Sequence, residues 1–195
     1  MGDEIDKNAA NSVFAAIDLA LAAIGFLPVA TLIGAVGNTF SSIQNATLIE
    51  NLYAFFSTAR KANTKEREKF FAELGADKER FIRNIIIAID RMNDMKKSEM
   101  IGNLFVNLVE GYFLKEEFVR LCFVIEKVYV DDLYALKDKN SVIHKIQKFQ
   151  EVEEPMYIQT LIANGLLQNA KPAVGIASPI KYEVTRLGNV FIRYS

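Results

Sequence analysis

The sequence has few of the residues that carry most protein chemistry. Its 195 residues include one cysteine, Cys122, and one histidine, His144. A single cysteine cannot form a disulfide within the chain, and one cysteine with one histidine supplies too few nitrogen and sulfur ligands for a zinc site. We therefore expect no bound metal and no cofactor.

Recognisable catalytic motifs are missing too. The sequence contains no GxxxxGK(S/T), HExxH, GxSxG or CxxC pattern. Cys122 stands among apolar residues, where nothing would lower the pKa of its thiol, and His144 has no Ser, Cys or acid at a motif spacing. The sequence predicts a protein that is not an enzyme and has no catalytic residues.

Neither sign of charge is in excess. The chain has 23 Lys and Arg residues against 24 Asp and Glu, a net charge of −1, so no overall field attracts nucleic acid or anionic lipid. Hydrophobic residues make up 51% of the chain, which is enough for a sizeable core. A membrane or nucleic-acid contact would have to come from a local feature.

One long segment has no charge at all. From Leu19 to Ile49 there are 31 consecutive residues without Asp, Glu, Lys or Arg. Pro28, preceded by Gly25, divides this segment, because proline is tolerated in the first turn of a helix but breaks its interior. The pattern predicts an apolar hairpin of two helices, roughly 9–26 and 29–49.

Each helix of this hairpin has an apolar face and a narrow face of small or polar residues. The candidate membrane or oligomer face consists of Asn11, Ala15, Asp18, Ala22, Gly25, Gly34, Asn38 and Ser41. Small residues let helices approach closely in lipid, and an intramembrane Asp18 would face a partner or a water-filled cavity. Each helix is near the lower limit of about 20 residues for crossing a bilayer. Two interpretations stay open, namely a membrane hairpin that oligomerises around Asp18 and a soluble hairpin packed on the following helices.

Residues 50–112 are expected to form a helical bundle. Apolar residues keep helical spacing from Thr47 to about Ala62, and further helices are predicted up to Leu74, from Asp77 past Ile89, and up to Gly111. Asn63 and Asp77 are the expected N-caps, and Gly75 ends a helix. The run 85–87 is all isoleucine, but charges at helical spacing flank it and favour a helix over a strand.

Residues 113–195 are predicted to begin with one helix from Lys115 to about Leu136. A helix from Pro155 to Asn164 follows, then Leu166–Gln168, a loop, a strand at Ile180–Val184 and a closing helix from Thr185 to Ile192. This order of elements is typical of a winged-helix unit with a small β-hairpin.

The predicted recognition helix of this unit has little to offer DNA. Residues 155–164 contain no Arg or Lys, and three glutamates, Glu151, Glu153 and Glu154, come directly before them. The candidate contacts to nucleic acid or to a partner are Lys145, Lys148, Gln159, Lys171 and Lys181. Because DNA recognition needs donors to base edges backed by phosphate-binding bases, we expect protein contact instead of nucleic-acid binding.

Four segments in the C-terminal half carry a resemblance to a known family. They are SEMIGNLFVNLVEG (98–111), EEFVRLCFVIEKVYVDDLYAL (116–136), YIQTLIANGLLQ (157–168) and YEVTRLGNVFI (182–192). In these segments the chain resembles the abortive-infection alpha type of bacterial proteins, a family linked to phage defence. The resemblance implies a bacterial defence or prophage-borne protein and carries over no catalytic residues.

The sequence thus predicts a mainly α protein in three parts: an apolar hairpin (1–49), a helical bundle (50–112) and a winged-helix-like region (113–195). We expect a homo-oligomeric, non-enzymatic phage-defence protein on the cytoplasmic side of the bacterial inner membrane that binds a protein partner. Arg60 and Lys61, which follow the apolar segment, would keep the rest of the chain cytoplasmic. The alternative is a DNA-binding winged-helix regulator in the cytoplasm.

Overall fold

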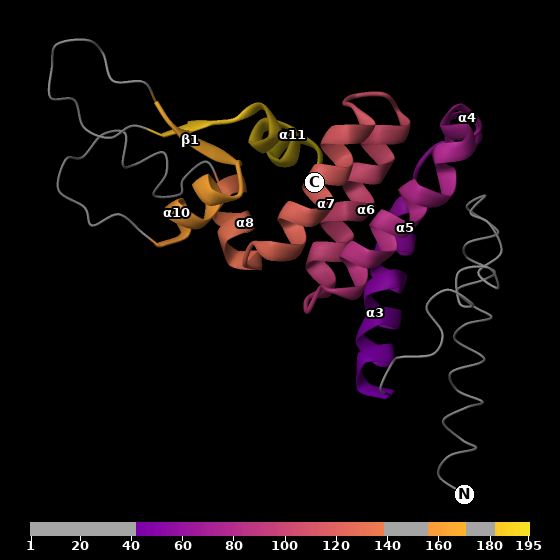
Figure 1. The fold of residues 1–195 in the computed structure, drawn as a ribbon, viewed down its shortest axis with the longest axis horizontal. Coiled ribbons are helices and arrows are strands. Elements are labelled where there is room, and N and C mark those ends of the chain that lie inside the picture. The colour runs from indigo at the N-terminus through magenta and orange to yellow at the C-terminus, as the bar shows by residue number, and fades with distance from the viewer. Residues whose placement is uncertain (1–41, 139–155, 171–181) are drawn as a thin grey trace, which may run out of the picture.

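The computed structural model describes residues 42–138, 156–170 and 182–195, which are mainly helical with one small antiparallel pair of strands (Figure 1). This confirms the mainly α fold class. The elements in chain order are α3 (Ser42–Ala59), α4 (Thr64–Leu74), the 3-10 turn η1 (Gly75–Asp77), α5 (Lys78–Asp90), α6 (Met95–Val109), α7 (Lys115–Lys127), α8 (Val130–Lys137), α10 (Met156–Ala163), β1 (Leu167–Asn169), β2 (Tyr182–Val184) and α11 (Arg186–Tyr194). The predicted hairpin lies in residues outside those described, apart from its last residues.

Helices α3, α5, α6 and α7 form the main body of the described protein (Figure 1). Their core centres on Phe105 of α6, whose ring centroid lies 5.9 Å from that of Phe55, 6.1 Å from Phe71 and 6.2 Å from Phe118. Two of these pairs are edge-to-face, the arrangement that aromatic quadrupoles favour. One ring cluster therefore joins α3, α4, α6 and α7.

Helix α6 lies directly on α3 at Gly102. A Cβ atom at this position would stand 2.7 Å from Cβ of Thr58 and 2.9 Å from the carbonyl oxygen of Phe55. Both distances are shorter than packed atoms tolerate, so only glycine permits the two helices to approach this closely.

A buried amide holds α3 to the end of α5. Asn51 is 1% exposed, and its Nδ2 donates hydrogen bonds to the carbonyl oxygens of Met92 (2.7 Å) and Ile89 (3.5 Å). The last carbonyls of a helix have no partner within it, so Asn51 satisfies groups that burial would otherwise leave unpaired.

Several local predictions are confirmed. Asn63 caps α4 by accepting from the backbone N–H of Lys65 at 2.9 Å, and Gly75 ends that helix. The isoleucine run is part of α5, with Ile85 buried and the two following isoleucines half-buried. Helical periodicity was a better guide than β-propensity here because one face of α5 is buried against the bundle.

The prediction of a single helix from Lys115 to about Leu136 is wrong. The chain divides it into α7 and α8, with Val128 and Tyr129 in extended conformation (ψ 140° and 141°). Val128 is fully buried by this break, and Asp131 and Asp132 come to lie in the first turn of α8, where the helix dipole favours carboxylates. The β-branched run around Tyr129 also weakens helix formation at this point.

Two helix starts also differ from the prediction. Helix α3 is already formed at Ser42, so residues 42–49, predicted to end the hairpin, belong to a helix that places Leu48 and Leu52 in the core. Asp77 makes no side-chain capping bond to α5, because its carboxylate contacts Lys115 of α7 instead and the chain enters α5 through η1.

The C-terminal elements follow the predicted order. Strands β1 and β2 pair antiparallel, with Leu167 opposite Val184, and Thr185 caps α11 by accepting from the N–H of Gly188 at 3.0 Å. A Cβ on Gly188 would stand 2.2 Å from the carbonyl oxygen of Leu166, so α11 packs directly on the turn after α10. The loop predicted between the strands, 169–179, lies outside the described residues from position 171 on, and Asn169, its first predicted residue, belongs to β1.

No described helix combines the length and the apolar character that a membrane crossing requires.

Replacing Gly102 with alanine tests the close crossing of α3 and α6. Glycine to alanine inside a helix normally stabilises by about 0.5–1 kcal/mol. Here we expect the opposite sign, a loss of about 1–3 kcal/mol in the free energy of unfolding, because the added methyl group overpacks the crossing. Urea unfolding followed by circular dichroism measures the difference, and a variant as stable as the parent would contradict the crossing.

Candidate functional site

One of the site residues predicted from the sequence, Gln159, lies in the described part of the chain, where it is exposed on α10. The others fall outside the described residues: Asn11, Ala15, Asp18, Ala22, Gly25, Gly34, Asn38, Ser41, Lys145, Lys148, Lys171 and Lys181. They stay predictions.

The outward face of α10 is uncharged. Met156 is 86% exposed, and Gln159 and Ala163 share its side of the helix at helical spacing. On the opposite side Ile158 and Leu161 are fully buried, and the helix packs on α8 and β1. Since α10 contains no Asp, Glu, Lys or Arg, this face offers an apolar and hydrogen-bonding surface without charge.

An ion pair fixes the start of α11 on α7. The guanidinium of Arg186 donates to both carboxylate oxygens of Glu117, and the second oxygen also accepts from the backbone N–H of Leu114 at 3.0 Å. These hydrogen bonds hold the pKa of Glu117 below its ordinary value, with Arg186 as the largest cause. Glu117 therefore joins the first turn of α7 to the first turn of α11.

The end of α11 is held as well. Lys137 of α8 donates to the backbone oxygen of Ser195 at 2.6 Å, and Asn107 of α6 donates to that of Tyr194 at 3.2 Å. The Tyr194 ring stacks on Tyr112 and Phe113, with centroids 5.3 and 5.5 Å apart. Desolvation by burial lowers the pKa of Lys137. Contacts at both ends thus fix α11 against α6, α7 and α8.

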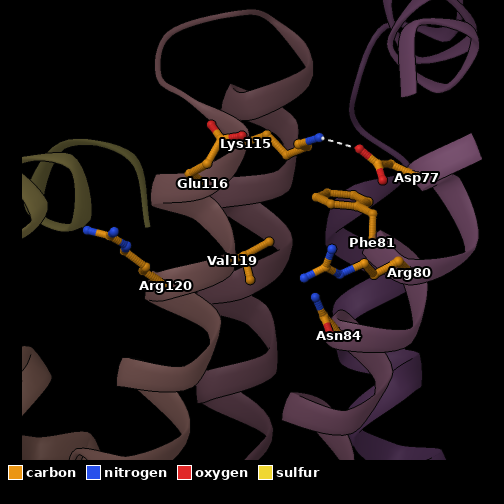
Figure 2. A pocket seen from close by; sticks show the side chains of 8 residues that line it. All are labelled: Asp77, Arg80, Phe81, Asn84, Lys115, Glu116, Val119 and Arg120. Carbon is orange, nitrogen blue, oxygen red and sulfur yellow. Dashed lines mark hydrogen bonds and ion pairs between the residues drawn. The ribbon is translucent and has the colours of Figure 1, made fainter. Parts of the chain in front are cut away.

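A cavity of about 380 Å³ opens between α5 and α7 (Figure 2). It is lined by Asp77, Arg80, Phe81, Asn84, Lys115, Glu116, Val119 and Arg120. Lys115 and Asp77 form an ion pair of 3.3 Å across one end. In Figure 2, Arg80 and Asn84 extend from α5 into the space between the helices, whereas Arg120 points away from α5.

No local pattern in the sequence indicates this cavity. Asp77 and Lys115 are 38 positions apart, and the sequence predicts a helix cap at the first and a helix start at the second. Arg80 belongs to a charged flank of α5, which helical spacing identifies only as solvent-exposed. The cavity forms where two helices pack together, and no pattern of neighbouring residues marks that place. Only the tertiary structure therefore reveals the cavity.

Lys97 is a buried lysine whose amine bonds to the backbone of a neighbouring helix. Lys97 is 4% exposed, and its Nζ donates to the carbonyl oxygen of Glu126 at 3.0 Å, near the end of α7. Desolvation lowers the pKa of Lys97, while the negative charges of Glu126 and Asp94 act in the opposite direction. Lys97 thus connects α6 with α7 through this hydrogen bond.

The cysteine environment agrees with the sequence interpretation. Cys122 is 1% exposed within the core, and burial raises the pKa of its thiol well above the ordinary value. A thiol becomes nucleophilic as its pKa falls, so Cys122 is unreactive in the folded protein. In the described segments no group of three or more His, Cys, Asp or Glu side chains is arranged to hold a metal ion.

Replacing Arg186 with glutamine tests the connection between α7 and α11. We expect the pKa of Glu117 to rise toward its ordinary value of about 4.3. A lowered native pKa stabilises the fold above the unfolded-state value, and this contribution is lost as pH falls through the native pKa. The loss of stability in Arg186→Gln should therefore be largest near neutral pH and disappear below the native pKa of Glu117.

Carboxyl NMR titration and unfolding at several pH values measure both effects. Arg193→Gln is the matched control, because Arg193 lies on the same helix and contacts the Tyr194 ring instead of Glu117. An unchanged Glu117 pKa in Arg186→Gln would contradict the ion pair.

Comparisons with protein-family models, with curated proteins and with solved structures find no match for this chain.

Proposed function

We propose that this protein acts by binding and not by catalysis. In this proposal it is a bacterial phage-defence protein, attached to the cytoplasmic side of the inner membrane by residues before Ser42. A winged-helix-like unit of α10, β1, β2 and α11 contacts a protein partner. The defence role rests on the resemblance of the four C-terminal segments described above.

The observation that carries the binding role is the exposed, uncharged face of α10. Met156 is 86% exposed at the first position of this helix, and Gln159 follows one turn later. Protein interfaces are enriched in methionine and depleted of charge at their centre. Helix α11 is held at both ends and packs on the turn after α10, so these contacts fix the position of the α10 face.

The charges of the same unit favour a protein over DNA. A recognition helix normally offers basic and amide side chains to base edges and phosphates. Helix α10 has no basic residue, and Arg186 of α11 is engaged by Glu117. Gln159 alone on α10 has the amide that could contact a base.

The proposed membrane attachment belongs to the part of the charge-free segment that precedes α3. Leu48 and Leu52 are buried in the core, so they are not free to contact lipid. The remaining charge-free residues, 19–41, keep the small and polar face with Asp18 just before them. A deletion that tests attachment should therefore end at residue 41.

Substitution of Met156 by glutamate tests the binding face. We expect cells expressing the intact protein to lower the plating efficiency of at least one phage in a panel, and Met156→Glu to restore plating, because a charge at the interface centre resists desolvation. Met95→Glu is the matched control, since Met95 is also an exposed methionine at the first position of a helix.

Two outcomes would count against the binding face. Equal effects of the two glutamate variants would remove α10 as the contact, and a panel without any protected phage would remove the defence role. Binding of duplex DNA that weakens as salt rises would replace the protein partner with a DNA-binding regulator.

Membrane fractionation tests the attachment. We expect the intact protein in the membrane pellet after lysis and a variant lacking residues 1–41 in the supernatant, with the same thermal unfolding for the remaining helices. Intact protein that stays entirely in the supernatant would end the membrane proposal and leave the α10 proposal standing.

A further inference from the structure

The cavity between α5 and α7 collects hydrogen-bond donors from two helices. Arg80 and Asn84 extend into it from α5, and Lys115 borders it from α7 (Figure 2). Neither Arg80 nor Asn84 has a side-chain ion pair or hydrogen bond within the described residues. The guanidinium group of Arg80 therefore has no partner among the described residues and is available to a ligand.

The base of the cavity is apolar. Phe81 is 3% exposed, and Val119 of α7 is half-buried and points toward it in Figure 2. A volume of about 380 Å³ lies within the usual range of about 300–1,000 Å³ for small-molecule sites. Apolar surface beside a few convergent donors is the composition that such sites share.

The charges around the cavity favour an anion. The lining cations Arg80, Lys115 and Arg120 outnumber the lining carboxylates Asp77 and Glu116, with Arg120 adding its charge from a side chain that points away from α5. The Lys115–Asp77 pair is open to solvent, with side chains 34% and 62% exposed, and exposed pairs of this kind are weak. An incoming oxyanion can therefore replace Asp77 as the partner of Lys115 at little cost in free energy. It can also accept hydrogen bonds from the guanidinium of Arg80, which has no partner among the described residues.

We propose that this cavity binds a small organic anion through its phosphate or carboxylate group. Arg80 holds the oxyanion by two parallel N–H donors of its guanidinium, a geometry that matches two oxygens of a carboxylate or of a phosphate, and Asn84 and Lys115 complete the set of donors. The apolar part of the ligand lies against Val119 and Phe81. Asp77 competes with the ligand for Lys115, so it limits affinity.

Titration of the full chain with inorganic phosphate and, separately, with butyrate tests the site at constant ionic strength. We expect saturable NMR shifts at the Arg80 side chain and at the first turn of α7 with at least one of the two anions. Arg80→Gln should weaken binding about tenfold, since a charge-assisted hydrogen bond is lost. Asp77→Asn should strengthen binding, because the competing charge is removed.

Arg83→Gln is the matched control. Arg83 is exposed on the same helix three residues later and does not line the cavity, so its loss should leave the affinity unchanged. Thermal unfolding of each variant verifies that the fold is intact. The proposal is overturned if neither anion saturates, if Arg83→Gln weakens binding as much as Arg80→Gln, or if Asp77→Asn weakens it.

Discussion

The described structure depends on the close contact between α6 and α3 at Gly102. Helix α6 contacts several other helices of the described fold: Phe105 enters the ring cluster, Lys97 bonds the end of α7, and Asn107 bonds the end of α11. A wider separation of α3 and α6 would move these three contacts together. Because well-packed interiors transmit displacements and do not absorb them, one missing side chain sets the positions of many others.

Both proposed binding surfaces lie on or beside elements that pack on α6. The cavity lies between α5 and α7, and α6 packs on α7 while α3 packs on α5. The α10 face is carried by α8 and β1, and α11 connects this unit back to α6 and α7. The two surfaces differ in chemistry, since the cavity is rich in charge and the α10 face has none. They therefore suit different partners.

Local patterns in the sequence predicted the helices α4, α5 and α10 and both ends of α4, because caps and periodic apolar faces are properties of neighbouring residues. The start of α5 was not predicted, since Asp77 contacts Lys115 instead of capping the helix. The break at Val128 was missed because an apolar residue at helical spacing satisfies the same pattern, and only burial in the core favours the extended conformation there. The cavity was missed for a related reason, since Arg80 and Lys115 acquire a shared role only when α5 and α7 meet. Of the predicted site residues, Gln159 alone lies in the described part of the chain, where it is exposed on α10, and its contact to a partner stays a prediction.

The charge-free segment has more than one physical cause. Leu48, on α3, is buried in the protein core, so packing in the core explains the lack of charge near it without a membrane. If the second predicted hairpin helix contacts lipid only before Ser42, residues 29–41 remain, which are fewer than the about 20 that a bilayer crossing requires. A pair of full crossings is therefore a poor fit to this segment. Attachment along the bilayer surface needs an apolar face with polar residues opposite, and the predicted face with Asn11, Asp18 and Asn38 would supply the polar side.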